Sequence, residues 1–431
     1  MPDRQISGNR IMPDKAESGL LIAYLAPEIP ALSATFVYNE ILELGKQGVK
    51  VKAFSVHRPA NIAAEASLTN LKKEVFHLYE TSKLQVLLDN VNMLITHPVG
   101  YLKSFGRLLA DITQQGLVSR SAFGLGYRFF YAATLAKQLN QANVQHLHVH
   151  FAHIPTDIGM YASPMAGIEF SVQAHANDLF ERGWLLKQKV ARSAFFATIS
   201  DFNKRFLEDL QADPNKIQIV RCGVDQSWQP PVKSLKKNDI FTVGTVGRLI
   251  EKKGIDTLIS AISGLVRDGR DVCLKIAGSG PLELALKQQA TSLGLTEETV
   301  QFVGALPHDK VAKFISGLDV FVLPCKKDSN GDMDGIPVVL MEAMLCEVPV
   351  ISTELSGIPE LVINNQSGLI VSPENDIELS KAIGQLMDSP DTKLRIISGG
   401  KQRVVDEFLL NKNVARLSKL IQSSISIRIS Q

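Results

Sequence analysis

Strand-like and helix-like patterns of hydrophobic residues alternate along the first half of the chain. The apolar run GLLIAYLA is followed by the amphipathic pattern TFVYNEILELGKQG and then by a second strand-like run, VKVKAFSV. Further strand-like runs follow at VQHLHVHFA, EFSVQAHA and FFATIS. This order is typical of repeated strand–helix–strand units, so it predicts a parallel sheet.

A second alternation of the same kind begins after residue 239. Its strand-like runs, separated by helical patterns, are IFTVGTVGRL, VCLKIAGSG, VQFVGAL, VFVLPC, PVISTEL and GLIVS. The segment between the two series, GVDQSWQPPVKSLKKND, has two consecutive prolines and a basic polar stretch, which is the composition of a linker. The pattern therefore predicts an α/β protein with two Rossmann-like domains, and two domains imply a cleft.

The length of 431 residues suits two domains of about 200 residues each. We expect a flexible tail at residues 1–16, because this opening is polar and rich in Gly, Pro and charge. The expected division continues with an N-terminal domain (17–222), a linker (223–239), a C-terminal domain (240–403) and a final helix (404–431).

Residues 83–114 carry apolar side chains at helical spacing, with an interruption at Pro98. Two interpretations stay open: a helical pair packed on the first domain, or a surface that meets a membrane or a lipid-linked acceptor. Lys103 and Arg107 lie beside the second stripe. The stripes consist of Leu84, Leu87, Leu88, Val91, Leu94 and Ile95, and of Tyr101, Leu102, Phe105, Leu108 and Leu109.

Composition and charge exclude several classes of protein. The formal net charge is +2, from 46 basic and 44 acidic residues, so no broad electrostatic footprint for nucleic acid exists. The four cysteines lack a paired spacing, which argues against a zinc knuckle or a disulfide framework and fits a reducing cytoplasm. No apolar run approaches the roughly 18 to 20 residues of a membrane span, and no signal peptide is expected at the start.

The stretch NGDMDGIPVVLMEAM holds the first candidate site. Pro337 suits the first position of a helix, and Gly335 allows close approach of the backbone to a ligand. The free N–H groups from Gly335 to Val339, together with the helix dipole, would bind an anion such as phosphate. Glu342 then falls among apolar residues in the second turn, where a carboxylate needs a polar partner.

Two cations follow the first strand of the second half. Arg248 and Lys253, in GRLIEKKG, come at the carboxyl end of FTVGTV, the edge of a parallel sheet where ligands bind. With the helix N-terminus they could neutralise a diphosphate. The alternative is an exposed turn with solvated charges.

The ordered motifs GRLIEKKG, IAGSGPL, VQFVGALPHDKV, DVFVLPC, DGIPVVLMEAM, PVISTELSGIPELV and SGLIVS resemble the nucleotide-sugar domain of retaining family 4 glycosyltransferases, which share the two-domain GT-B fold. The first half resembles that family more loosely, through SATFVYNEI, HLHVHFA and QAHANDLF. With SGIPELV, these stretches are most similar to the subgroup that builds bacterial exopolysaccharides, including colanic-acid-type enzymes. The resemblance also implies that the final helix crosses back onto the first domain.

The resemblance assigns roles to two carboxylates with seven residues between them, Asp334 and Glu342. Glu342 would accept hydrogen bonds from the ribose hydroxyls of the donor, and Asp334 would face the hydroxyls of the donor sugar. The family usually has Glu at the first position. Aspartate is one methylene shorter, so the contact with the sugar would be looser or the sugar different.

The resemblance extends the site to both domains. Arg248 and Lys253 would hold the donor diphosphate, and His175 would face the donor sugar from the first domain. The loop at Ala305 and Leu306 would meet the nucleobase through its backbone. The remaining donor-binding positions are Gly247, Gly278, Gly335, Ile336, Pro337 and Val338.

The implied reaction moves a sugar from a nucleotide sugar to a hydroxyl of a saccharide or lipid-linked saccharide, with retention of anomeric configuration. The leaving phosphate oxygen would help to deprotonate the acceptor, so no dedicated nucleophile, cofactor or metal is expected. We expect a cytoplasmic protein, with peripheral association with the inner face of the cell membrane left open.

Competing hypotheses concern the metal and the class of protein. The triplet DMD, Asp332 to Asp334, matches the Asp-x-Asp motif that binds manganese in the other large glycosyltransferase fold. The surrounding run fails as a calcium loop, because Met333 replaces the required glycine and Val339 the last glutamate.

Nucleotide-sugar 2-epimerases and glycogen phosphorylases share the architecture, although a phosphorylase would be much longer. A degenerate, non-catalytic sugar-nucleotide-binding protein is the remaining alternative.

Overall fold

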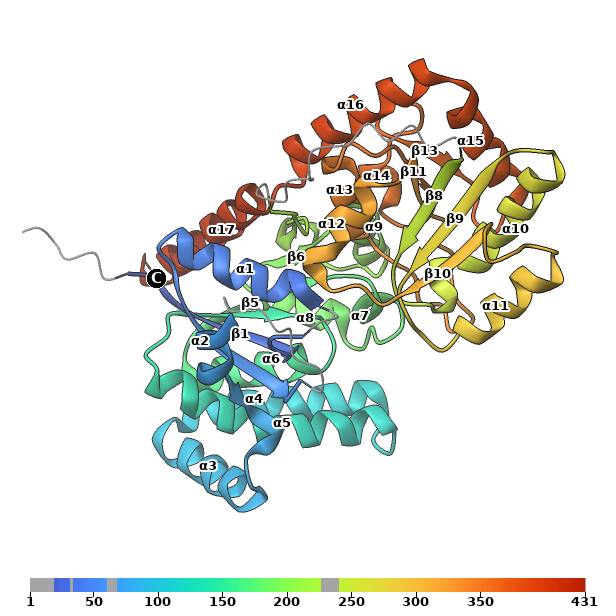
Figure 1. The fold of residues 1–431 in the computed structure, drawn as a ribbon. Helices are drawn as coiled ribbons and strands as arrows, with labels where there is room; N and C mark the ends of the chain where they lie inside the picture. Colours follow the sequence, from blue (N-terminus) through green and yellow to red (C-terminus); the bar gives the residue numbers. More distant parts are fainter. Residues whose placement is uncertain (1–18, 32–33, 60–67, 226–239, 431) are drawn as a thin grey trace, which may run out of the picture.

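The computed structural model describes residues 19–31, 34–59, 68–225 and 240–430. The expected tail and most of the expected linker, residues 226–239, lie outside these ranges. The described chain contains two parallel sheets, each with helices on both faces (Figure 1). Both expected Rossmann-like domains are therefore present.

The first sheet has seven parallel strands in the order β3-β2-β1-β4-β5-β6-β7. Side chains of the central strand β1 alternate between two cores: Ala23 and Leu25 pack with α5 and α6, whereas Ile22 and Tyr24 pack with α1 and α17. Both faces are thus buried, as expected for parallel strands. The strands are β1 (Leu21–Glu28), β2 (Lys50–His57), β3 (Phe76–His77), β4 (His146–His150), β5 (Glu169–Ala174), β6 (Phe196–Thr198) and β7 (Ile217–Ile219).

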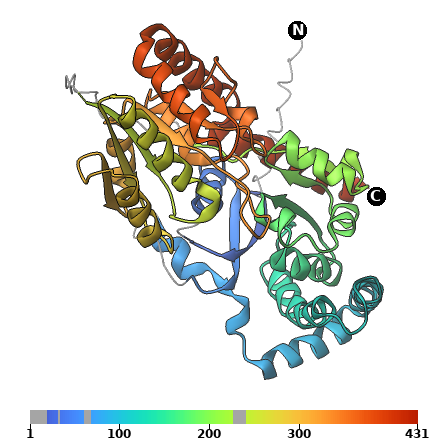
Figure 2. The same cartoon turned by 90° about the vertical axis from the view of Figure 1, so that its right-hand side faces the viewer.

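The helices of the first domain form one layer on each face of this sheet (Figure 2). They are α1 (Thr35–Lys46), α2 (Thr69–Glu74), η3 (Leu78–Glu80), α3 (Lys83–Thr96), α4 (Pro98–Gln115), α5 (Arg120–Gln141), α6 (Ile154–Ala166), α7 (Asn177–Phe180), α8 (Leu186–Arg192), α9 (Asp201–Asp209) and η4 (Pro214–Lys216).

The second sheet has six parallel strands in the order β10-β9-β8-β11-β12-β13. Its strands are β8 (Phe241–Val246), β9 (Val272–Ala277), β10 (Val300–Gly304), β11 (Val320–Leu323), β12 (Val350–Thr353) and β13 (Leu369–Val371). Its helices are η5 (Glu251–Lys253), α10 (Ile255–Arg267), α11 (Glu283–Ser292), α12 (His308–Ser316), α13 (Val338–Leu345), α14 (Ile358–Leu361), α15 (Asp376–Asp388) and α16 (Pro390–Glu407). Helix α13 packs against β11 and β12, so the candidate Pro337 loop stands at the carboxyl edge of this sheet.

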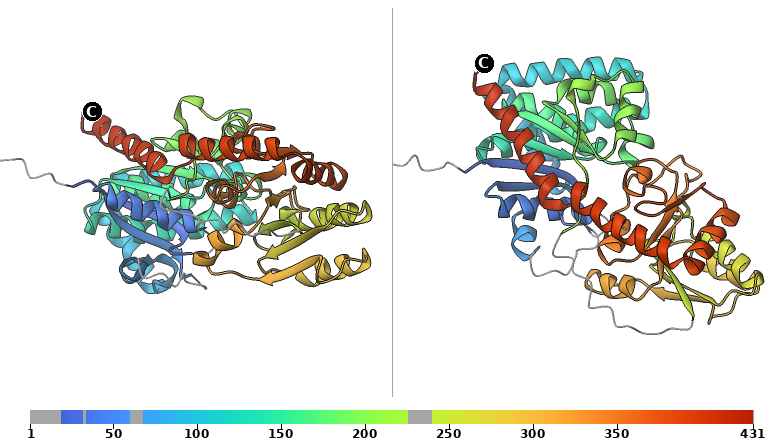
Figure 3. Two further views of the ribbon diagram at one scale, coloured as in Figure 1. Left: turned by 45° about the horizontal axis from the view of Figure 1, so that its top comes forward. Right: turned by 90° about the horizontal axis from the view of Figure 1, so that it is seen from above.

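The chain returns to the first domain through α17 (Leu410–Ser430), seen from above in Figure 3. Leu417 and Ile421 of α17 are buried against the first sheet. The expected start of this final helix at Val404 is wrong, because Val404 belongs to α16 and the chain breaks between the two helices at Phe408 and Leu409.

The two connections between the domains are hydrogen-bonded to each other. Val224 N donates to Phe408 O at 3.0 Å, and Leu410 N donates to Val224 O at 2.9 Å. A Cβ atom at Gly223 would lie 2.5 Å from Leu410 Cα, so only glycine allows this approach. The first residues of the expected linker therefore form a paired hinge.

Helices α3 and α4 pack on α5 and α6 of the first domain, as one of the two interpretations expected, but most of their apolar stripe faces outward. Leu84 and Ile95 are 68% and 73% exposed, while Asp89 and Asn90 are buried on the opposite side of α3. Leu108 is the stripe residue of α4 that is buried. No helix among the described residues is long and apolar enough to cross a membrane.

Candidate functional site

The candidate site begins where loops leave the carboxyl ends of β8, β9 and β10. Gly247 N donates to Ala277 O at 3.0 Å, and Gly278 N donates to Gly304 O at 2.8 Å, so these loops hold one another. A Cβ atom at Gly278 would lie 1.8 Å from Gly247 O, and its φ is +145°. Glycine at this position therefore lets two predicted donor-binding loops touch.

Lys253 and Asp334 form the central ion pair of the site. Lys253 Nζ lies 2.7 Å from Asp334 Oδ2, and Lys252 Nζ lies 3.5 Å from Asp334 Oδ1. Both side chains of the central pair are 15% exposed. The structure thus joins two predicted residues, and adds Lys252, which the sequence reasoning missed although it lies next to Lys253 in the same motif.

The charges of this pair persist at neutral pH. Burial acts to lower the pKa of Lys253, but the charge of Asp334 outweighs it and the pKa is raised. For Asp334, burial acts to raise the pKa, and the charges of Lys253 and Lys252 bring it below its ordinary value. Lys252 Nζ also lies 2.7 Å from Asp332 Oδ2, so the cluster of two lysines and two aspartates is balanced in charge.

Helix α13 opens beside this pair without a side-chain cap. Pro337 is the residue before the helix, with φ −65° and ψ 123°, so its expected place in the first turn is wrong by one residue. Because ψ of Pro337 is extended and not helical, the helix begins at the next residue, Val338. An N-terminus without a side-chain cap is compatible with the predicted anion site, which stays a prediction.

Glu342 is a buried carboxylate without a partner. It is 9% exposed, and no hydrogen bond or ion pair joins it to any residue that the structure describes. Burial raises the pKa of Glu342 to about 7. Burying an unpaired carboxylate costs folding free energy, which makes Glu342 a candidate ligand-binding residue.

Arg248 is exposed at the same edge of the sheet. Its guanidinium forms no hydrogen bond or ion pair within the described part of the chain. The preceding residue, Gly247, lies against the Lys253 side chain, since a Cβ atom there would be 3.6 Å from Lys253 Cε. Leu306 is half-buried between β10 and α12, at the carboxyl end of the edge strand. Both residues thus lie at the edge where they were predicted.

The two domains meet at the Asp334–Pro337 loop. A Cβ atom at Gly335 would lie 2.5 Å from Ile199 Cδ1 and 3.6 Å from Ala176 Cβ, both from the first domain. Ile336, which is buried, lies in the same contact region beside Gly357 and Ser200. A side chain at Gly335 would thus meet the first domain, and the expected approach of its backbone to a ligand stays a prediction.

A second contact between the domains involves Glu360 in the motif SGIPELV. Its carboxylate accepts from Phe202 N at 3.0 Å, near the start of α9, and from Arg221 Nη1 at 2.6 Å. An acidic group suits the N-terminus of a helix. The sequence reasoning gave no role to Glu360, and its partner Arg221 lies 139 residues away.

His175 stands at the end of β5, next to Ala176, and so lies near the Gly335 loop. Its ring is buried, with Nε2 3.3 Å from His150 Nδ1 and Nδ1 3.6 Å from Cys222 Sγ. Burial, with the charges of His150 and His153, lowers the pKa of His175 well below its ordinary range. The imidazole is therefore neutral, and both nitrogens already have protein partners.

His150 extends this network to a carboxylate, because its Nε2 lies 2.9 Å from Glu40 Oε1. The hydrogen-bond pattern then assigns Nε2 of His175 as the donor to Nδ1 of His150. Glu40, His148 and His150 form the one group among the described residues that could hold a metal ion, with ligand atoms within 4.8 Å. By contrast, Asp332 and Asp334 each bind a lysine.

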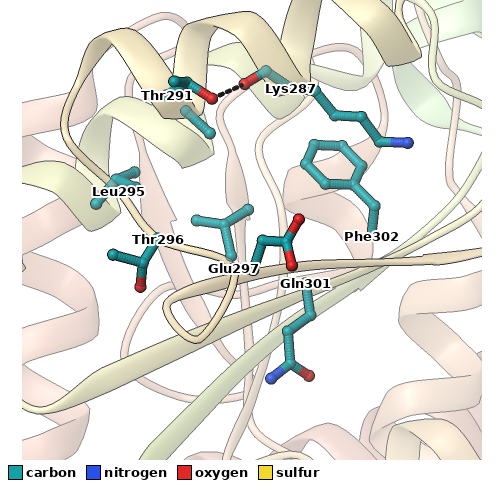
Figure 4. A pocket seen from close by; sticks show the side chains of 9 residues that line it. Lys287, Thr291, Leu295, Thr296, Glu297, Gln301 and Phe302 are labelled. Atoms are coloured by element: carbon teal, nitrogen blue, oxygen red, sulfur yellow. Dashed lines mark hydrogen bonds between the residues drawn. The ribbon is translucent and has the colours of Figure 1, made fainter.

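A groove at the outer edge of the second sheet does not belong to this site (Figure 4). Its volume is about 420 Å³, and it lies between α11 and β10. Lys287 extends over the ring of Phe302 at 5.3 Å, and Thr291 donates to the backbone oxygen of Lys287. None of the predicted donor-binding residues lines it.

Comparisons with known proteins agree with this arrangement. A family model for glycosyl transferases group 1 matches residues 227–403. A protein of Salmonella typhimurium named as a colanic acid biosynthesis glycosyltransferase, WcaL, is 34% identical over 421 residues, which cover 93% of this chain and 99% of that protein. The amylovoran biosynthesis glycosyltransferase AmsK of Erwinia amylovora is 28% identical over 423 residues, with coverage of 91% and 97%.

Solved structures share the fold. Anabaena HepE in complex with UDP has a TM-score of 0.70 at 15% identity, and the match covers 94% of this chain and 100% of that one. At this identity the likeness concerns the fold alone. The GT-B architecture expected from the sequence is confirmed.

Proposed function

Because the chain belongs to the group 1 glycosyltransferases, we propose that it transfers a sugar from a nucleotide-sugar donor to a hydroxyl acceptor with retention of anomeric configuration. The donor lies at the carboxyl edge of the second sheet, and the acceptor enters from the first domain. Ligand binding at this edge is general for open parallel sheets.

The unpartnered carboxylate of Glu342 is the observation that carries the proposal. In the donor complex, this carboxylate accepts hydrogen bonds from the two ribose hydroxyls. The donor thus supplies the partners that the protein itself does not provide. Hydrogen bonds to a charged group contribute about 1.5–3 kcal/mol each. The nucleobase lies against the backbone at Ala305 and Leu306.

The donor diphosphate binds at the N-terminus of α13, between Arg248 and Lys253. In this complex, phosphate oxygens take the place of Asp334 as partners of Lys253, and Asp334 turns to the hydroxyls of the sugar. The uncapped helix and the contact of Lys253 with the loop before it support this arrangement. These cations stabilise the charge that develops on the departing nucleotide.

The reaction breaks the bond between the anomeric carbon and the phosphate oxygen. The acceptor oxygen forms its bond to the same carbon on the same face, and its proton passes to the departing phosphate. No protein nucleophile takes part. His175, neutral and with both ring nitrogens bonded within the protein, contributes shape beside the sugar, and its network through His150 to Glu40 fixes the orientation of its ring.

The lysines that bind Asp332 and Asp334 supply positive charge, so we propose that the reaction needs no metal. The relatives named for amylovoran and colanic acid biosynthesis support a role in exopolysaccharide assembly, with a saccharide or lipid-linked saccharide as acceptor. We place the reaction in the cytoplasm, with the enzyme peripheral to the membrane.

The test is incubation of the protein with a panel of radiolabelled nucleotide sugars, followed by NMR of the product. Slow hydrolysis or transfer that preserves the anomeric configuration is expected. Inversion of configuration would refute the retaining mechanism, interconversion of the donor would indicate an epimerase, and binding without turnover would indicate a non-catalytic protein.

A further inference from the structure

Helices α3 and α4 turn polar side chains inward, beside the buried Val86, Met93 and Leu108, and expose most of their other large apolar side chains. On the inner side of α3, Asp89 accepts from Lys137 Nζ at 2.7 Å, and Asn90 Nδ2 donates to Phe130 O at 2.9 Å. On the inner side of α4, Asp111 binds Arg192 and Ser104 donates to Tyr161 O. An ordinary surface helix has the opposite arrangement. The outer faces of these helices are therefore built for an apolar environment.

The exposed apolar residues lie on α3, α4, the turn after α4 and α5, whose helices pack against one another, and we call them together the α3–α5 face. Views in two directions place α3 at the end of the first domain farthest from the second (Figures 1 and 2). Ile95 is 73% exposed, Val99 80% and Val118 86%. The face consists of Leu84, Leu87, Leu88, Val91, Leu94, Ile95, Val99, Leu102, Phe105, Leu109, Leu117, Val118, Phe123, Tyr127 and Phe130.

The same segment exposes positive charge and no carboxylate. Between Lys83 and Phe130 the acidic residues are Asp89 and Asp111, which are 2% and 1% exposed and ion-paired inward. Lys83, Lys103 and Arg120 are exposed beside the apolar residues, and Arg107 is half-buried among them. The charge of the face is thus complementary to an anionic surface.

A groove between α3 and α5 deepens the apolar face. It has a volume of about 240 Å³ and is lined by Val86, Leu87, Tyr127, Phe130 and Tyr131, with Lys83 at its edge. Apart from Lys83, its lining is apolar or aromatic. It has the dimensions and lining to take part of one hydrocarbon chain.

We propose that the α3–α5 face docks on the surface of an anionic lipid bilayer. Apolar side chains, with aromatic rings among them, enter the boundary between headgroups and acyl chains, and the cations contact lipid phosphates. Contact with a second copy of the chain through this face would instead bring like charges together. The proposal defines a surface for the membrane contact and does not depend on the identity of the transferred sugar.

The experiment is co-sedimentation of the full chain with vesicles of phosphatidylcholine, with and without about 30% phosphatidylglycerol. The wild-type protein is expected to bind the anionic vesicles at least about tenfold more tightly, with weaker binding at high salt. The double variant Leu88→Glu/Ile95→Glu, at positions 52% and 73% exposed, should lose at least about tenfold in affinity. Lys83→Ala/Lys103→Ala should lose about tenfold on anionic vesicles only.

The matched control is Leu284→Glu/Leu394→Glu, in which two leucines of the second domain, 69% and 65% exposed, receive the same change. It should bind vesicles as the wild type does. All variants should keep the melting temperature and the affinity for a nucleoside diphosphate, which separates failure of docking from failure of the donor site. Absence of wild-type binding, or equal loss in the control, would overturn the proposal. The proposal would also be overturned if light scattering showed a dimer, if Leu88→Glu/Ile95→Glu converted that dimer to monomers, and if the wild-type protein did not bind vesicles.

Discussion

The amino group of Lys253 lies 2.7 Å from Asp334 Oδ2, and this ion pair joins the loop after β8 to the loop before α13. The two residues are far apart in the sequence, and each was assigned to the donor site from a different motif. The contact shows that these loops share one edge of the second sheet. In the proposed donor complex, the diphosphate competes with Asp334 for Lys253.

Lys253→Ala and Arg248→Ala should each lower turnover by about tenfold to a thousandfold, because each removes positive charge from the departing diphosphate. The measurement is kcat with a saturating nucleotide sugar. Lys327→Ala changes an exposed lysine in the same loop region and is the control. Turnover at the wild-type level in either site variant would remove that residue from the proposed mechanism.

Glu342→Gln should stabilise the free protein above pH 7. The folded pKa of Glu342 is about 7, above its usual 4.5, so only the unfolded chain ionises it between these values. Wild-type stability therefore falls as the pH rises from about 4.5 to about 7, by on the order of 3 kcal/mol. The glutamine variant lacks this loss. Urea unfolding at pH 5 and pH 8 measures the free energy of unfolding of both proteins. An equal pH dependence in the two would contradict the raised pKa of Glu342.

Nucleoside diphosphate affinity should rise with pH and level off above pH 7, because the ionised form of Glu342 accepts the ribose hydroxyls. Binding at pH 6.5 then releases a proton. Calorimetry in buffers of different ionisation enthalpy measures this release. Glu342→Gln should remove the share of it that comes from the carboxylate, leaving the share from the terminal phosphate, and should weaken binding by about tenfold to a hundredfold. Proton uptake by the wild-type protein would refute the role of the carboxylate.

Gly335→Ala should lower the melting temperature and kcat/KM, because the new methyl group would lie 2.5 Å from Ile199 Cδ1 across the domain contact. Ile199→Val removes that Cδ1 atom. The double variant should therefore recover most of the activity, whereas Ile199→Val alone should have a small effect. A double variant as impaired as Gly335→Ala would show that the domains do not meet there in the active enzyme.

Activity should survive EDTA, because Lys252 and Lys253 bind the carboxylates of the DMD triplet. The assay compares initial transfer rates before and after chelation. Complete loss that manganese restores would favour the Asp-x-Asp hypothesis instead.

The sequence predicted those parts of the fold and site that depend on local pattern. Alternation of strands and helices located both sheets, and the position of Arg248 and Lys253 directly after a strand placed them at the correct edge. Glu342 was identified because it is a single carboxylate within an apolar helical run. In each case the residues that carry the signal are neighbours in the chain.

Features that depend on distant partners were missed or wrong. The apolar spacing of α3 identified the helix but not which face is buried, since the inward face is held by Asp89 and Lys137, 48 residues apart. The role of Glu360 depends on Arg221 from the other domain. Likewise, the alternation in HLHVH places His146, His148 and His150 on one side of β4, but only the fold brings His150 to His175.

A crystal structure of the protein with a bound nucleoside diphosphate tests the central claim most directly. The account predicts the ribose hydroxyls within hydrogen-bond distance of Glu342, and the phosphates at the N-terminus of α13 in contact with Arg248 and Lys253. A nucleotide bound in the groove between α11 and β10, with Glu342 still unpartnered, would contradict it.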